Sequence, residues 1–180
     1  MTDVSARKPS NVSKAAQAIA VGGLVAGMLD LGQALVLFGA KIPLAIAAGL
    51  LGPQAFGGGV ATYGLGVLLH FFIALSAATL YFVTSRKLRF LVESPLVCGL
   101  FFGAAVDLVM RLIVLPLSAL HASGPYPYRD LVQGLVVHMV VIGLPISFSV
   151  RRFAREAEPV GEPRGSGPLR AGYEAIAKRG

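Results

Sequence analysis

The chain has 180 residues, of which 55% are hydrophobic and only 14% are charged, and its formal net charge is +7 at pH 7. Soluble domains carry about a quarter charged residues, so this composition excludes an ordinary soluble domain and favours a chain that lies largely in lipid. The single cysteine, Cys98, excludes an internal disulfide framework. The positive charges lie between the apolar runs, so they do not indicate a nucleic-acid partner.

Four apolar segments are long enough to cross a bilayer, which needs about 20 residues of helix. A shorter apolar segment, residues 42–51, has Pro43 near its start and is predicted to be an interfacial or re-entrant helix on the outer side. The predicted fold class is therefore an all-α, polytopic membrane protein with four transmembrane helices, whose main partner is the lipid bilayer. The predicted spans are residues 15–40, 59–83, 95–120 and 131–150.

Lysine and arginine residues predict the orientation of the spans, because cytoplasmic connections carry an excess of them. Three lie in residues 1–14, three lie between the second and third spans, and seven lie in residues 151–180. The other two connections contain only Lys41 and Arg129. Both termini are therefore predicted to be cytoplasmic. Residues 1–14 form a cytoplasmic tail, residues 15–150 a four-helix transmembrane domain, and residues 151–180 a disordered basic cytoplasmic tail.

An internal repeat relates the odd spans to each other and the even spans to each other. The segment GLVAGMLDLGQALVLF of the first span aligns with GLFFGAAVDLVMRLIVL of the third after one single-residue gap, and both contain G-L-x-x-G followed by Asp and Leu. The second and fourth spans share G-x-x-x-H in GVLLHFF and GLVVHMV. These matches predict two similar helical hairpins with the same orientation. The G-x-x-x-G spacing predicts close helix–helix packing.

Five ionisable residues lie well inside the predicted spans, and a helix bundle could bring them together. At a rise of 1.5 Å per helical residue, all five fall between the middle of the membrane and the outer leaflet. Charges at such depth are costly and usually face the protein interior, where they find partners. These residues are Asp30, His70, Asp107, Arg111 and His138. Asp107 and Arg111 are four residues apart on one helix face, with the acid first, which is the favourable order.

Three hypotheses account for this intramembrane polar cluster. In the first, a non-enzymatic membrane protein binds or conducts a proton or a small polar solute, since histidine titrates near neutral pH and Asp, Glu and His relay protons in membranes. In the second, the protein is structural or scaffolding, and the charges only hold the bundle. In the third, the two Asp and two His residues hold a metal ion, or the two His residues ligate a b-type haem. The sequence assigns no catalytic residue, cofactor or metal, and it leaves a homodimer open.

The pattern of four spans with cytoplasmic ends, G-x-x-x-H in the even spans and G-L-x-x-G in the odd ones resembles the YagU-like bacterial inner-membrane proteins. The segments that carry the resemblance are GLGVLLHFFIALSAATLYF, GLFFGAAVDLVMRLIVLPL and QGLVVHMVVIG. A sister family of unknown function is an alternative. The resemblance implies a multi-pass protein of the bacterial inner membrane with a role in acid or envelope stress, and it implies no catalytic residue.

Overall fold

Four helices of the computed structural model are long and apolar enough to cross a membrane. They lie over Val12–Phe38, Val60–Lys87, Pro95–Leu117 and Tyr128–Ala154. The structure describes the backbone of residues 11–157 and the side chains of residues 12–154, and within this part of the chain no strand occurs. The predicted all-α architecture with four apolar helices of spanning length is confirmed. The predicted tails lie outside the described residues over 1–10 and 158–180.

The first half of the chain forms two long helices joined by a short helical segment. Its elements are α1 (Asn11–Phe38), α2 (Ile42–Leu51), the short 3-10 helix η1 (Pro53–Gly57) and α3 (Val60–Lys87). Gly39 and Gly52 follow the ends of α1 and α2 with φ of +86° and +85°, a conformation that glycine adopts without steric cost. The short helix α2 coincides with the predicted segment and packs against α3.

The second half contains two spans that are each interrupted by a π-helical segment. The third span consists of α5 (Pro95–Val109), η2 (Met110–Val114) and α6 (Leu115–Leu117), and the short helix α4 (Phe90–Glu93) precedes it. The fourth span consists of α7 (Tyr128–Val137), η3 (His138–Gly143) and α8 (Leu144–Ala157). Here η2 and η3 are the π-helical segments.

A proline follows each π-helical segment after one leucine. Pro116 follows η2 and Pro145 follows η3. A proline inside a helix cannot donate a backbone hydrogen bond, and its ring clashes with the carbonyl four residues earlier. The wider π turn gives that carbonyl room. The fourth span continues past Pro145 to Ala157, whereas the third ends at Leu117, directly after Pro116. In both spans the π-helical segment therefore lies immediately before a Leu-Pro pair.

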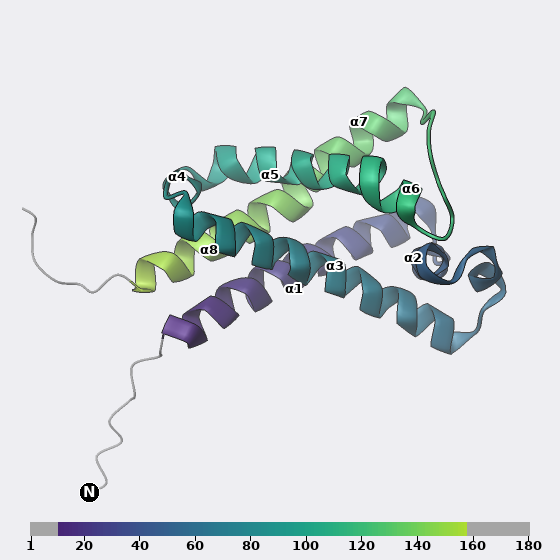
Figure 1. Cartoon of the computed structure of the whole chain (residues 1–180), viewed down its shortest axis with the longest axis horizontal. Coiled ribbons are helices and arrows are strands. Elements are labelled where there is room, and N and C mark those ends of the chain that lie inside the picture. The colour runs from purple at the N-terminus through teal and green to yellow at the C-terminus, as the bar shows by residue number, and fades with distance from the viewer. Residues whose placement is uncertain (1–10, 158–180) are drawn as a thin grey trace, which may run out of the picture.

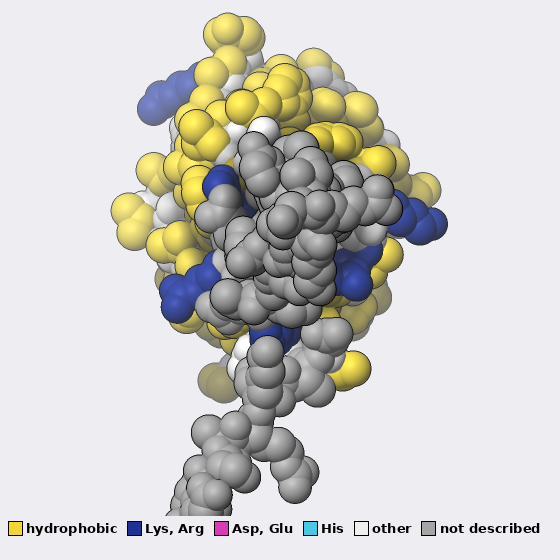
Figure 2. Space-filling view, turned by 90° about the vertical axis from the view of Figure 1, so that its left-hand side faces the viewer, with side chains coloured by type: hydrophobic (Ala, Val, Ile, Leu, Met, Phe, Trp, Pro, Cys, Tyr) yellow, Lys and Arg dark blue, Asp and Glu magenta, His cyan; other side chains and the backbone are white. Residues whose placement is uncertain are grey.

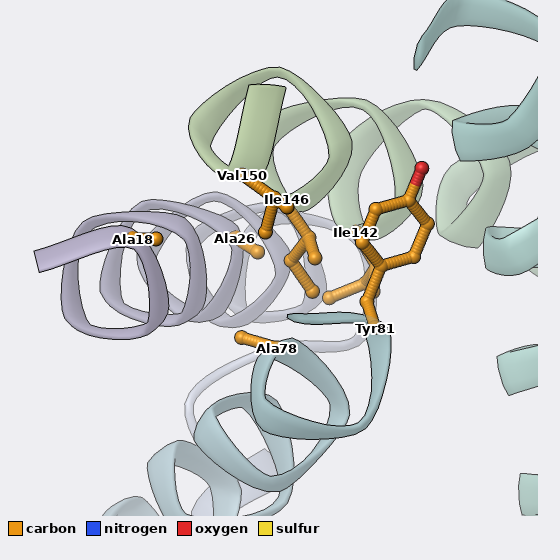
Figure 3. Packing of buried hydrophobic residues seen from close by; sticks show 7 residues of the cluster. All are labelled: Ala18, Ala26, Ala78, Tyr81, Ile142, Ile146 and Val150. Atoms are coloured by element: carbon orange, nitrogen blue, oxygen red, sulfur yellow. The ribbon is translucent and has the colours of Figure 1, made fainter. Parts of the chain in front are cut away.

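The helices pack around a core of small and branched side chains. α1 lies against α3 and α8, and α5 lies against η3 and α8 (Figure 1). The buried cluster in Figure 3 consists of Ala18, Ala26, Ala78, Tyr81, Ile142, Ile146 and Val150. Tyr81 is its largest member, and its hydroxyl donates a hydrogen bond of 2.9 Å to the carbonyl of Leu91, which satisfies the polar end of the side chain.

Glycines let the helix backbones approach closely, as the G-x-x-x-G spacing predicts. A Cβ on Gly103 would overlap the His138 carbonyl, and a Cβ on Gly143 would overlap the carbonyl of Gly99. In the first half, a Cβ on Gly23 would lie 2.8 Å from Cδ2 of Leu75 on α3. Both G-x-x-x-G patterns therefore lie at helix–helix contacts, because only a residue without a side chain fits there.

The first described turn of α1 and the last turn of α8 lie at the same end of the bundle (Figure 1). Lys and Arg side chains surround this end (Figure 2). α8 continues to Ala157, seven residues beyond the predicted end of the fourth span at Val150. Its basic residues Arg151 and Arg152 have good helix propensity, and the first proline after them is Pro159. The start of the predicted disordered tail is therefore helical.

Candidate functional site

Asp107 on α5 forms the centre of one polar group and is only 4% exposed. Its Oδ2 accepts a hydrogen bond of 2.9 Å from Nε of Arg111, which lies in η2. The two residues are four apart, so one turn of the same span supplies both charges. The buried carboxylate is thereby neutralised by a fixed guanidinium, which offsets the cost of its burial.

His138, the first residue of η3, is the second partner of this carboxylate. Its Nδ1 lies 3.2 Å from Oδ1 of Asp107 and 2.8 Å from the carbonyl oxygen of Gly134, one turn earlier in the same span. A carbonyl oxygen can only accept a hydrogen bond, so Nδ1 carries the hydrogen and points it at two acceptors. Nε2 is then the ring nitrogen at which His138 can accept a further proton.

The guanidinium of Arg111 has three further neighbours besides the Asp107 carboxylate. Nη2 donates a hydrogen bond of 3.0 Å to the carbonyl oxygen of Asp130 in α7. The guanidinium carbon lies 5.4 Å from the ring centre of Tyr126, a distance that allows a cation–π interaction. A Cβ on Gly134 would overlap Nη2. Glycine at this position therefore makes the space that the arginine side chain fills.

A second polar group lies between α1 and α3. Nε2 of His70 is 2.9 Å from the carbonyl oxygen of Gly27 and 3.9 Å from Oδ2 of Asp30. The carbonyl again requires that this nitrogen carry the hydrogen, so Nδ1 of His70 is the position open to a further proton. Gln33 donates a hydrogen bond of 3.3 Å from Nε2 to Oδ1 of Asp30. The side chains of Asp30 and His70 are 15% and 13% exposed.

The five residues of the predicted cluster therefore lie in two groups. Asp30 and His70 join α1 to α3, whereas Asp107, Arg111 and His138 join the third span to the fourth. Between residues 12 and 154 no ion pair or hydrogen bond links one group to the other. The depth of a residue along its helix can be counted from the sequence, but the direction in which its side chain points depends on the packing of the helices.

The hypothesis of a two-His, two-carboxylate metal site is not supported by this arrangement. Among the described side chains, no group of three or more His, Cys, Asp or Glu residues is placed to hold a metal ion. Each histidine instead pairs with one carboxylate and one backbone carbonyl. The two imidazoles also belong to different groups, one on α3 and one in η3.

Sequence reasoning missed the residues that complete each group. Gln33, Tyr126, Gly134 and the backbone of Asp130 all contact the charged side chains. The G-x-x-x-H spacing contained a signal for Gly134, because a residue four positions before a helical histidine lies on the same face one turn away. The two Leu-Pro pairs, in which Leu115 precedes Pro116 and Leu144 precedes Pro145, contained a signal for the π turns at the site.

Comparison of the chain with models of protein families, with curated proteins and with solved structures finds no match.

Proposed function

We propose that this chain is a non-enzymatic, multi-pass protein of the bacterial inner membrane that binds and releases protons at intramembrane Asp–His pairs. Its two helical hairpins run in the same direction, with both termini in the cytoplasm, where the excess of lysine and arginine belongs. Four helices of spanning length support this topology. The resemblance to the YagU-like proteins supports a role in acid or envelope stress.

The observation that carries the proposal is the pairing of Asp30 with His70. The side chains of both residues are more than four-fifths buried, and within residues 12–154 His70 supplies the cationic partner of this carboxylate. When His70 holds one proton, the pair has a net charge of −1. When it holds two, the pair is neutral. Proton uptake therefore removes a net charge from a site that lies among membrane-spanning helices, where such a charge is costly.

The second group has the opposite charge balance. Asp107 and Arg111 already cancel each other, so the group is neutral when His138 holds one proton and has a charge of +1 when it holds two. The same pairing of residue types thus has two different consequences. Protonation of His70 completes an ion pair with Asp30, whereas protonation of His138 adds a positive charge to a group that is already neutral. We assign the exchangeable proton to the Asp30–His70 pair.

A structural function of the second group is favoured by the number of contacts that Arg111 makes. It binds Asp107 on its own span, the backbone of Asp130 on the fourth span and the ring of Tyr126 in the connection between them. These contacts fix the register of the third span against the fourth, a role in which polar residues are effective within membranes. The scaffolding hypothesis therefore applies to this half of the protein.

Proton uptake by purified protein in liposomes tests the assignment. The uptake after a downward pH step, read from a pH-sensitive dye in a choline buffer, is compared for the wild type, His70→Gln and His138→Gln. The proposal predicts that His70→Gln removes roughly one proton per chain and that His138→Gln removes less. Uptake that is equal in the wild type and in His70→Gln would contradict it.

A further inference from the structure

An open apolar groove of about 520 Å³ runs along the outer face of α3. The hydroxyl groups within it are already satisfied by their own helix. Ser76 donates a hydrogen bond of 2.7 Å to the carbonyl of Phe72, and Thr79 donates one of 2.8 Å to the carbonyl of Leu75. The lining side chains therefore offer an occupant hydrocarbon and no free hydroxyl donor. All of them belong to α3, and they are Phe72, Leu75, Ser76, Thr79, Leu80 and Val83.

The groove has the length of one membrane leaflet and occupies the second half of α3. Its lining extends from Phe72 to Val83, which is about 16 Å at the helical rise of 1.5 Å per residue. The hydrocarbon core of a bilayer is about 30 Å thick, so one leaflet contributes about 15 Å. An acyl chain that reaches from the headgroups to the middle of the membrane therefore matches the groove in length.

Two exposed basic residues continue the face of the groove at the end of α3. Arg86 and Lys87 follow Val83 by three and four residues, the spacings that place side chains on one helix face. Directly after them, Leu88 and Phe90 are exposed apolar residues. Long basic side chains can cover such apolar surface with their stems while their charged ends reach the headgroups. The groove therefore ends beside two cations at the level where lipid phosphates lie.

The surroundings of this end of the groove are positively charged. α8 packs against α3 and α4 and contributes Arg151 and Arg152. Lys and Arg side chains surround the same end of the bundle in Figure 2. Among the described side chains of residues 84–97 and 146–154, Glu93 is the one carboxylate. A headgroup with a net negative charge is therefore favoured here over a zwitterionic one.

We propose that the groove binds an acyl chain of an anionic phospholipid whose phosphate lies at Arg86 and Lys87. The lipid belongs to the leaflet at the end of the bundle where α1 begins (Figure 1). A second copy of the chain fits this face less well. Two copies in one orientation that packed symmetrically through it would bring identical basic residues together, and like charges oppose such a contact. The lipid site is independent of proton binding at Asp30 and His70.

Tryptophan fluorescence tests the proposal, because the chain contains no tryptophan of its own. Leu80→Trp places one in the groove, and Phe101→Trp on the exposed face of α5 is the matched control. Leu80 lies seven residues before the end of α3 and Phe101 six residues after the start of α5, so both are about 10 Å into their spans. The full chain is reconstituted in phosphatidylcholine vesicles that contain increasing fractions of a lipid with brominated acyl chains, either phosphatidylglycerol or phosphatidylcholine. Bromine quenches a tryptophan that it contacts.

We expect brominated phosphatidylglycerol to quench Leu80→Trp with an apparent affinity roughly tenfold higher than that of brominated phosphatidylcholine. At Phe101→Trp the two lipids should differ by at most about twofold. Adding Arg86→Gln and Lys87→Gln to Leu80→Trp should remove most of the preference, because the phosphate then loses both cations. Adding Lys41→Gln instead, at the opposite end of α1, should preserve it.

Equal quenching of Leu80→Trp by the two lipids overturns the proposal, and so does a preference that survives the double substitution of Arg86 and Lys87. A tryptophan that is protected from both lipids until the protein is diluted in the bilayer assigns the groove to a second copy and also overturns it. Native mass spectrometry of the chain with Leu80 intact avoids the bulk of the indole. The wild type released from mixed bilayers should retain phosphatidylglycerol in preference to phosphatidylcholine, and equal retention by the Arg86→Gln, Lys87→Gln variant would contradict the site.

Discussion

His138 and Arg111 bind different oxygens of the Asp107 carboxylate. Nδ1 of His138 lies 3.2 Å from Oδ1, and Nε of Arg111 lies 2.9 Å from Oδ2. The two cationic or donor groups therefore do not compete for one lone pair, and each approaches from a different π-helical segment. The Asp107 carboxylate therefore links the third span to the fourth.

Removing either charge of the Asp107–Arg111 pair should destabilise the protein more than removing both. Asp107→Asn leaves an unpaired buried guanidinium and Arg111→Gln leaves an unpaired buried carboxylate, so we expect each to lower the free energy of unfolding by about 3 kcal/mol. The double variant should lose less free energy of unfolding than either single variant. Denaturation in mixed micelles measures all three values, and additive losses would show that the pair is not coupled.

Gly134→Ala should displace the Arg111 side chain. The new Cβ would overlap Nη2, so the guanidinium must give up its hydrogen bond to Asp130, at a cost of about 1–2 kcal/mol. Gly32→Ala is the matched control, because nothing lies within 4 Å of that Cβ, and helix propensity should make this variant up to about 1 kcal/mol more stable. Equal changes in the free energy of unfolding would refute the close fit of arginine against glycine.

Gly103→Ala should push the third span away from the fourth and destabilise their contact. Its Cβ would overlap the backbone of His138, which cannot move without shifting the whole π turn, so we expect a loss of about 3 kcal/mol. Gly64→Ala on α3 has open space around it and serves as the control. Disturbance of the Asp107–His138 contact in the first variant should also appear as a changed imidazole signal in NMR spectra. A variant as stable as the wild type would show that Gly103 does not pack closely against the backbone of His138.

Much of the architecture followed from hydropathy alone. Runs of apolar residues predicted four helices of spanning length and the short helix over Ile42–Leu51, because length and composition decide whether a helix can cross a bilayer. The i,i+4 spacing also placed Asp107 beside Arg111 correctly. These features depend on neighbours in the chain, so the sequence shows them directly.

The division of the polar residues could not be predicted in this way. Whether His70 meets Asp30 or Asp107 depends on which face of α3 packs against α1, and glycines such as Gly23 and Gly27 decide that face through contacts far apart in the sequence. Gln33 has no charge and therefore gave no electrostatic signal. The helical continuation to Ala157 was hidden by the change to basic composition after Val150.

The orientation in the membrane is testable with single cysteines in a Cys98→Ser background. Lys41→Cys and Lys87→Cys place exposed thiols in the connection after the first span and at the end of the second. Because the basic excess should be cytoplasmic, we expect a membrane-impermeant maleimide to label the first in intact cells and to label the second only after lysis. The reverse pattern would invert the topology and place both termini outside.

Nitrogen-15 NMR of labelled histidine in lipid tests the central claim most directly, because chemical shifts of the two ring nitrogens report which of them carries a proton. His121, in an exposed connection, is the third histidine of the chain and provides an internal reference that His121→Gln assigns. At neutral pH we expect hydrogen on Nε2 of His70 and on Nδ1 of His138. As the pH is lowered, His70 should gain its second proton on Nδ1, and Asp30→Asn should suppress this step because it removes the carboxylate that pairs with the imidazolium. A His70 ring that remains singly protonated throughout the pH range in which the protein stays folded would contradict the account.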